Sequence, residues 1–562
     1  MLCGELVSAE FGIIFGMNNA NKRFANAYPG NAAEMKAEKA VCPQLVRGIG
    51  VALVAGGLLC VDAWAADGEV DWARLNAGAR EQAKMPVRTG VPGVRPFWNG
   101  RSRAFIHPPA FDFKEIAGAK EYRFTLEGDD RGESAAPIRS WTAAKPWTPV
   151  PSDIWDSLAP GYYTVKAAGS GERRFYRAAV FQGPYPARVR GYGDAARKVY
   201  AAVFHMPHVQ AWMTSDAPPE DYDLYCYPAK IMSAIIRALC RHAKAEPKDA
   251  AAALALAGKM SDWLIAHSQP VGAPLAHFPP TYWGDRRDVS VRYAGQNMLS
   301  YPAHVANAYF DLYEAGKDRK YLDAAIAIAR SYVRLQGADG TWPLKVLEKD
   351  GSPVRDNRIV PTRYLLGMFD RALAATGDAA FATARDRAFD YALRGPVTTW
   401  NWDAQFEDVD PKPPYYNLQK GVAVDVAIRL FSLGRNAEGC EIVDWCEDQF
   451  VAWSDPVHHM DWKNWRTPTA LEQYAYYTPI DASMGDMIGA FAAAYMATGN
   501  GLYLEKAKAL ADNVTRHQRA DGTLPTYFDS RRGSDWANCM VYAADRLEFL
   551  ESVINNCEKA ER

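Results

Sequence analysis

The chain has 562 residues, a formal net charge of −2 and 12% aromatic residues. This length exceeds what one ordinary hydrophobic core needs, so we expect two folded domains. The near balance of acidic and basic residues excludes a strong whole-chain attraction to nucleic acid or to an anionic membrane, although a local basic cleft is compatible with it.

Residues 1–65 are predicted to be an over-extended N-terminus followed by a signal peptide at about 35–65. The apolar run 49–60 follows Arg47 and is too short to span a bilayer. Residues 63–65, Ala-Trp-Ala, fit a cleavage site. We therefore expect a bacterial protein that is exported to the periplasm or secreted, with no stable membrane insertion after cleavage.

Lipid attachment at Cys60 is the less favoured alternative, because Leu59 before it is large. Residues 66–90 are expected to be a linker. Six cysteines remain after the predicted cleavage: Cys226, Cys240, Cys440, Cys446, Cys539 and Cys557. Their spacing matches neither a zinc site nor a disulfide scaffold, so we expect buried thiols, no metal and no cofactor.

Residues 91–187 are predicted to form a small antiparallel β-sandwich. Short alternating segments such as 122–126 and 162–166 are bounded by Gly, Pro or Asp. The runs 108–113 and 158–163 resemble fibronectin type III modules. The resemblance implies a fold and no particular activity.

Residues 190–558 are predicted to form an (α/α)6 toroid, a closed ring of six helical hairpins. The run Ala-Asp-Gly-Thr occurs at 338–341 and again at 520–523, and the two copies register at an offset of 182 residues. The glycines expected to end helices are spaced by 61, 57 and 65 residues: Gly316, Gly377, Gly434 and Gly499. The repeat unit is therefore about sixty residues, the size of a hairpin with a long loop.

Inner helices are expected near residues 300–315, 361–376, 418–433, 479–498 and 535–555, each followed by an outer helix. Helices near 193–206, 226–243 and 248–268 complete the ring. The long loops that return from outer to inner helices then share one rim, where we expect the functional site. These loops are 271–299, 338–360, 395–417 and 454–478.

The repeated Ala-Asp-Gly-Thr turn and the segments 400–409, 471–474 and 478–481 resemble the six-hairpin glycosidase superfamily. Within it, they look most like bacterial exo-β-glucuronidase-type enzymes that act on glucuronate-containing glycans. The resemblance covers about residues 190–555. It implies the toroid and a carbohydrate substrate, with no nucleic-acid partner, while the reaction follows only by analogy because one toroid hosts several chemistries.

Glycoside hydrolysis needs a carboxylic acid as proton donor and a second carboxylate. Loop 395–417 is rich in carboxylates and aromatic residues. Glu407 is the predicted proton donor, because Phe406 and nearby tryptophans are expected to raise its pKa by desolvation. Glu472, from loop 454–478, is the predicted second carboxylate.

Arginines on the rim are expected to grip a uronate carboxylate, and aromatic side chains to stack on sugar rings. The residues predicted to bind substrate are Arg292, Tyr293, Asn297, Arg355, Arg363, Trp402, Asp408, Tyr415, His458, Tyr474 and Trp536.

Hydrolysis that removes a glucuronate-type residue is the favoured function. The alternative is a polysaccharide lyase, which cleaves uronate glycans by β-elimination with a Tyr or His as base. Residues of the types it needs are Tyr293, Asn297, His304, Tyr415 and Tyr474. A non-catalytic glycan-binding role is a second alternative, and the carboxylates at Glu407 and Asp408 argue against it.

Overall fold

A computed structural model describes residues 70–88, 98–102, 104–130, 133–403, 405–410, 412–454, 465–529 and 535–561. The predicted signal peptide and His458 lie outside these ranges. No helix in the described part of the chain combines the length and the apolar character needed to cross a membrane.

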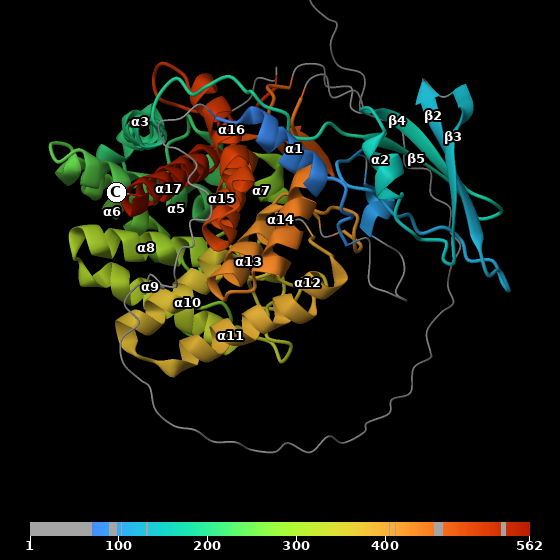
Figure 1. Cartoon of the computed structure of the whole chain (residues 1–562). Helices are drawn as coiled ribbons and strands as arrows, with labels where there is room; N and C mark the ends of the chain where they lie inside the picture. The colour runs from blue at the N-terminus through green and yellow to red at the C-terminus, as the bar shows by residue number, and fades with distance from the viewer. Residues whose placement is uncertain are drawn as a thin grey trace, which may run out of the picture. The chain divides into compact units, whose positions relative to one another are not determined.

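Among the described residues, six helices form a closed inner ring (Figure 1). They are α5 (Pro228–Ala245), α8 (Pro302–Gly316), α10 (Arg363–Thr376), α13 (Gly421–Ser432), α15 (Asp481–Thr498) and α17 (Ala537–Glu561). Each packs against the next, and α17 packs against α5, which closes the ring.

An outer helix packs against each inner helix. The outer helices are α6 (Ala250–Ala266), α9 (Arg319–Leu335), α11 (Ala379–Arg394), α14 (Asn436–Phe450), α16 (Gly501–His517) and α3 (Tyr192–His205). The predicted (α/α)6 toroid is confirmed. One detail was wrong: no described outer helix follows α17, and its partner is α3 from the opposite end of the ring domain.

The expected helix-ending glycines do end helices. Gly377, Gly434 and Gly499 have φ values of 71°, 73° and 70°, in the left-handed region that glycine adopts without strain. At the fourth position, Gly316 is the last residue of α8, and Lys317 takes the left-handed conformation with φ of 60°.

The repeated Ala-Asp-Gly-Thr turns make equivalent contacts. Gln336 donates to the carbonyls of Gly340 and of Ala384 in α11, at 2.7 and 2.8 Å. Gln518 donates in the same way to Gly522 and to Ala195 in α3, at 2.8 and 2.9 Å. Each turn therefore fixes one outer helix to the next, including the step that joins α16 to α3.

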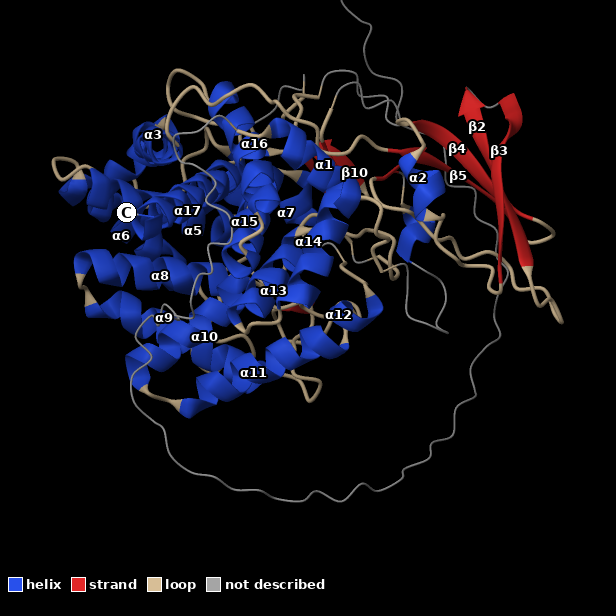
Figure 2. Ribbon diagram, in the orientation of Figure 1, coloured by secondary structure: helices blue, strands red, loops and turns tan. Residues whose placement is uncertain are grey.

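The described strands of the N-terminal region form one five-stranded sheet in the order β1-β5-β4-β2-β3 (Figure 2). They are β1 (Ala104–Phe105), β2 (Tyr122–Asp130), β3 (Glu133–Ala143), β4 (Gly161–Ala167) and β5 (Gly171–Arg177). Pairing is antiparallel except between β1 and β5. The described strands of this region make one sheet, so the second sheet of the predicted sandwich is not found among them, and the fibronectin-like character stays a prediction.

Helix α1 (Trp72–Gln82) lies in the segment expected to be a linker, and α2 (Ser152–Asp156) buries Trp155 near the sheet. The remaining short helices are η1 (Trp98–Arg101), α4 (Pro207–Gln210), η2 (Ala211–Met213), η3 (Asp223–Cys226), α7 (Asp288–Arg292) and α12 (Pro396–Thr399).

The four long loops meet on one rim, as predicted. β6 (Gln296–Met298) of the first loop pairs with β7 (Lys345–Leu347) of the second. Lys345 donates to the carbonyl of Glu407 in the third loop at 2.7 Å. The third and fourth loops join through Asn417, whose side chain donates to Gln473 at 2.9 Å.

The fourth loop forms a small sheet of β8 (Val451–Ala452), β9 (Thr469–Gln473) and β10 (Tyr476–Pro479). β9 contacts the N-terminal region through Tyr474 just beyond its end: the Tyr474 hydroxyl donates to Gln449 at 2.6 Å and lies 3.1 Å from the Ser102 hydroxyl.

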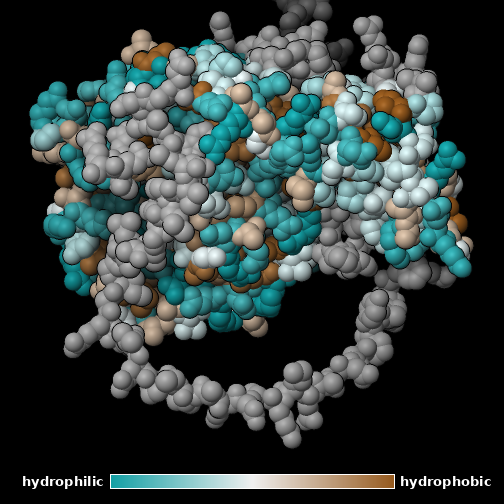
Figure 3. All heavy atoms as spheres, viewed as in Figure 1, coloured by the Kyte–Doolittle hydropathy of each residue, from teal (hydrophilic) through white to brown (hydrophobic). Residues whose placement is uncertain are grey.

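The apolar residues lie mainly inside the protein, and the exposed ones in the face that Figure 3 shows are scattered among hydrophilic residues. The six cysteines of the described chain are free thiols, of which Cys226, Cys240, Cys446 and Cys539 are buried and Cys440 and Cys557 half-buried.

Candidate active site

A pocket of about 380 Å³ opens among the rim loops. Its lining includes Lys230, Arg287, Asp408, Glu472, Tyr527 and Trp536. We call it the rim pocket. Of the residues predicted from sequence, it brings together Glu472, Asp408 and Trp536.

Glu472 lies in β9 and is half-buried. Burial raises the pKa of its carboxyl to about 7, against the opposing effect of the Lys420 and Lys230 charges. Within the described residues, this carboxyl makes no hydrogen bond or ion pair. A carboxyl with such a pKa is protonated in a large fraction of molecules near neutral pH and can donate a proton.

Asp408 is the second carboxylate of the rim pocket, and its side chain is accessible from the pocket while neighbouring residues remove part of its hydration. The loss of hydration in the pocket and the charge of Glu407 raise its pKa above the ordinary value. The rim pocket thus holds two carboxyl groups on neighbouring loops, and a pair of carboxyl groups is the group type that glycoside hydrolysis uses.

Two cations and an indole complete the rim pocket. The Lys230 ammonium lies 4.4 Å from the centre of the Trp536 ring, and the Arg287 guanidinium lies 5.7 Å from it. Arg287 is partly exposed, and its nearest carboxylate, Asp223, is 3.8 Å away. These groups can bind an anion beside an aromatic face.

Glu407 is not arranged as the predicted proton donor. Its side chain is fully buried, Lys230 donates to one of its oxygens at 2.6 Å, and Tyr301 donates to the other. Burial alone raises the pKa of Glu407, but the Lys230 charge and both hydrogen bonds outweigh it and hold that pKa below its ordinary value. The predicted rise in pKa was therefore wrong, because desolvation was considered without these partners.

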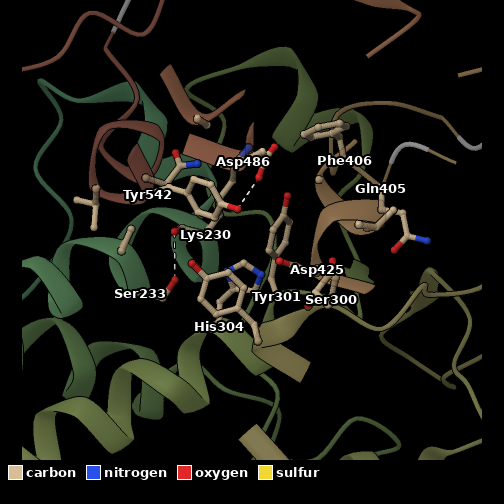
Figure 4. Close-up of a pocket in the computed structure, with 18 of the residues that line it drawn as sticks. Lys230, Ser233, Ser300, Tyr301, His304, Gln405, Phe406, Asp425, Asp486 and Tyr542 are labelled. Carbon is tan, nitrogen blue, oxygen red and sulfur yellow. Dashed lines mark hydrogen bonds between the residues drawn. The ribbon is translucent and has the colours of Figure 1, made fainter. Parts of the chain in front are cut away.

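A second cavity, of about 190 Å³, lies inside the ring. Lys230 and Phe406 line both this inner cavity and the rim pocket. Figure 4 shows Tyr301, His304 and Tyr542 around this cavity, with the Tyr542 hydroxyl directed toward Asp486. Lys230 and its partner Glu407 therefore stand where the two spaces adjoin.

Several hydrogen-bonded titratable side chains line the inner cavity or lie beside it. Tyr542 donates to Asp486, and Arg363 donates to the Tyr542 hydroxyl at 2.8 Å. Burial raises the pKa of Asp425 to about 6, although the charge of Arg363 opposes the change. Arg363 lies behind the lining of this cavity, bound to Tyr542, Tyr364 and Asp425, and its predicted contact with a uronate stays a prediction.

His304 is the histidine of the inner cavity. Its ring stacks on Tyr364 with the centroids 3.8 Å apart. Burial, together with the charges of Arg363 and Arg237, holds its pKa well below the ordinary value, so the imidazole is neutral. Neutral imidazole is the form that accepts a proton.

Three residues predicted to contact substrate are buried and line neither the rim pocket nor the inner cavity. Trp402 packs between Trp400 and Trp445. Asn297 is enclosed in β6 and donates to the Pro279 carbonyl at 3.0 Å. Tyr474 faces the N-terminal region.

Four further predicted residues lie outside both spaces. Arg292 and Tyr293 both bind Asp410, each at 2.8 Å. Tyr415 donates to the Thr399 carbonyl at 2.6 Å. Arg355 lines a separate pocket on the side of the rim.

The residues that were missed come mainly from the inner helices. Lys230, Asp425 and Asp486 each interrupt the apolar face of a helix that packs in the ring. A lone charge within such a run, as in the segment Val-Ala-Val-Asp-Val-Ala around Asp425, was the signal available in the sequence.

No family model and no curated protein matches the chain. Among solved structures, it is similar to cellobiose 2-epimerase from Spirochaeta thermophila, with a TM-score of 0.47 and 12% identity over 66% of this chain and 99% of that one. It is also similar to a family 76 glycoside hydrolase from a bovine Bacteroides thetaiotaomicron strain, with a TM-score of 0.42 and 11% identity over 77% of this chain and 93% of that one. A third similar structure is an unsaturated glucuronyl hydrolase specific for heparin, with a TM-score of 0.42 and 9% identity over 64% of this chain and 97% of that one. Likenesses of this strength assign no activity.

Proposed function

We propose that this protein is a carbohydrate-active enzyme, a glycoside hydrolase that removes a uronic acid from a glycan. The observation that carries the proposal is the rim pocket, where Glu472 has a pKa of about 7 and shares the space with Asp408. Export of the enzyme belongs to the same proposal and rests on the N-terminal sequence.

In the proposed reaction, protonated Glu472 donates its proton to the glycosidic oxygen as the bond to the sugar breaks. Asp408 acts on the sugar as the second carboxylate, either by activating water or by attacking directly. Glu407 has a positioning role, because it holds the Lys230 ammonium at the edge of the pocket.

Lys230 and Arg287 are proposed to bind the uronate carboxylate, and Trp536 to stack on the sugar ring. A neutral sugar offers these cations only hydroxyl groups, which bind them more weakly than a carboxylate does. The preference for a uronate therefore depends on Arg287 more than on Lys230, since Glu407 already neutralises the lysine.

Arg287→Ala is expected to lower kcat/KM for a uronate glycoside about 10- to 100-fold and to change little with the matching neutral glycoside. Arg319→Ala, at an exposed ion pair on α9, is the control and should leave kcat/KM unchanged for both glycosides. Equal losses on both substrates would make Arg287 structural, and a wild-type preference for the neutral glycoside would overturn the uronate assignment.

Elimination is the second candidate, and His304 is the observation that favours it. The neutral imidazole lies beside Tyr301 at the inner cavity and can accept the proton at C5 of a uronate, although its lowered pKa makes it a weak base. The other residues considered for this reaction, Tyr293, Asn297, Tyr415 and Tyr474, point away from both spaces or are buried. Hydrolysis therefore has the better-supported set of groups.

A further inference from the structure

The side of the rim carries another pocket, of about 500 Å³, between the second and third loops. Its lining includes Arg355, Arg358, Tyr391, Asn401, Asp403 and Lys412. We call it the lateral pocket. None of these residues is needed in the proposed reaction.

The charges of the lateral pocket are only partly satisfied. Arg358 pairs with Asp339 at 3.0 Å. Arg355 and Lys412 are exposed and have no ion-pair partner among the described residues. The lining also includes the exposed carboxylate of Asp356, which makes no ion pair among the described residues. The two unpaired cations exceed this one exposed carboxylate, which favours an anionic ligand.

The pocket also offers a hydrogen-bond acceptor that no protein group uses. One oxygen of Asp403 is buried without a partner, while the other accepts from Asn401 at 3.2 Å. Burial raises the pKa of Asp403 to about 6. A ligand hydroxyl can satisfy this acceptor once the side chains that cover the oxygen move aside.

The lateral pocket is connected to the site through one short segment. Gln405 lines both the lateral pocket and the inner cavity, and Phe406 lines both the inner cavity and the rim pocket. Gln405 is fixed by donating to the Arg358 carbonyl at 2.9 Å. A chain that binds in the lateral pocket therefore lies beside the loop that carries Asp408.

We propose that the lateral pocket is an accessory binding site for another acidic sugar of the same glycan, with Arg355 and Lys412 binding its carboxylate or sulfate and Asp403 accepting from a hydroxyl. The anionic-glycan ligand class rests on the proposed function. The pocket makes the protein bind acidic polymers more tightly than it binds a single terminal sugar.

Affinity electrophoresis tests this proposal without catalysis. The Glu472→Gln protein is run through gels that contain polygalacturonate, hyaluronan or heparin, with dextran as the neutral polymer. At least one acidic polymer should retard it and dextran should not, and salt should weaken the retardation. Arg355→Ala or Lys412→Ala should each weaken binding about 3- to 10-fold.

Lys349→Ala is the matched control, because Lys349 is an exposed lysine of the same loop and does not line the pocket. It should leave the retardation unchanged. The proposal is overturned if no acidic polymer retards the parent protein, if dextran retards it equally, or if the pocket variants bind as the parent does. A protein that binds in this way but hydrolyses no glycoside would instead refute the proposed function alone.

Discussion

Glu407 and Glu472 lie on neighbouring rim loops, but their surroundings move their pKa values in opposite directions. Glu407 is fully buried with a cation and a hydroxyl at its two oxygens. Glu472 is half-buried, and no donor of the described residues reaches its carboxyl. The less solvated group is thus the more acidic one, because direct partners stabilise the charged form.

Glu472→Gln should lower turnover at least about 100-fold, because glutamine cannot donate the proton. In the wild type, kcat/KM should fall as the pH rises above about 7, where Glu472 loses its proton. Since burial disfavours the charged carboxylate in the folded state, the variant should also be more stable than the wild type at alkaline pH. Rates across pH and urea unfolding measure both effects, and near-wild-type turnover would remove Glu472 from the reaction.

Glu407→Gln should lower the free energy of unfolding by about 3–5 kcal/mol, because it leaves the Lys230 ammonium without its countercharge. The folded-state pKa of Glu407 is lowered, so its contribution is present above the ordinary value of 4.5 and is lost as the pH falls through the folded value. The difference between variant and wild type should therefore shrink in acid.

Urea unfolding measures this loss, with Glu438→Gln at an exposed pair on α14 as the control, expected to change stability by less than about 1 kcal/mol. Adding Lys230→Met to Glu407→Gln should recover part of the loss. A variant as stable as the wild type would mean that the pair contributes nothing to the fold.

At the scale of the elements, strand β9 connects the proposed acid to the N-terminal region. Glu472 lies two residues before Tyr474, whose hydroxyl bonds to Gln449 of α14 and to Ser102. On the other side, Lys420 donates to the Glu472 carbonyl at 3.3 Å. The N-terminal region therefore helps to fix the strand that carries the acid, which is more than a spacer does.

Tyr474→Phe should cost about 1 kcal/mol of stability and lower kcat about 3- to 10-fold with little change in KM, because β9 loses an anchor beside Glu472. The alkaline limb of the pH profile should move as the surroundings of Glu472 change. Tyr313→Phe, on the ring helix α8, is the control for loss of a tyrosine hydroxyl. An unchanged kcat and pH profile in Tyr474→Phe would separate this contact from catalysis.

The elements themselves were predictable where their signal is local. The regular spacing of Gly377, Gly434 and Gly499 marked the helix ends. The inner helices start within about three residues of the expected positions. The partner of α17 was missed because α3 precedes it by more than three hundred residues, and only the closing of the ring brings the two together.

The site was predicted less completely, since the sequence gives no side-chain direction within an irregular loop. Trp402 and Glu407 are close in sequence to Asp408, yet they point into the protein while Asp408 faces the rim pocket. Lys230 comes from helix α5, which is far from these loops in the sequence. Its pairing with Glu407 is a consequence of tertiary structure.

At the scale of the whole molecule, the closed ring places all inner-helix starts at one rim, and the two carboxyls of the proposed reaction meet there from separate loops. The same rim brings cations to the rim pocket and to the lateral pocket. In a chain with a net charge of −2, these local groups decide which substrates bind.

The most direct test is to incubate the wild-type protein in ¹⁸O-labelled water with an oligosaccharide that has a terminal uronate and an internal uronate substituted at O4, and to follow both product mass and ultraviolet absorbance. Hydrolysis predicts a released sugar that carries one labelled oxygen, with no absorbance rise, and no product from Glu472→Gln. An absorbance rise from an unsaturated uronate, without incorporation of label at the cleaved bond, would contradict hydrolysis and assign the protein to elimination.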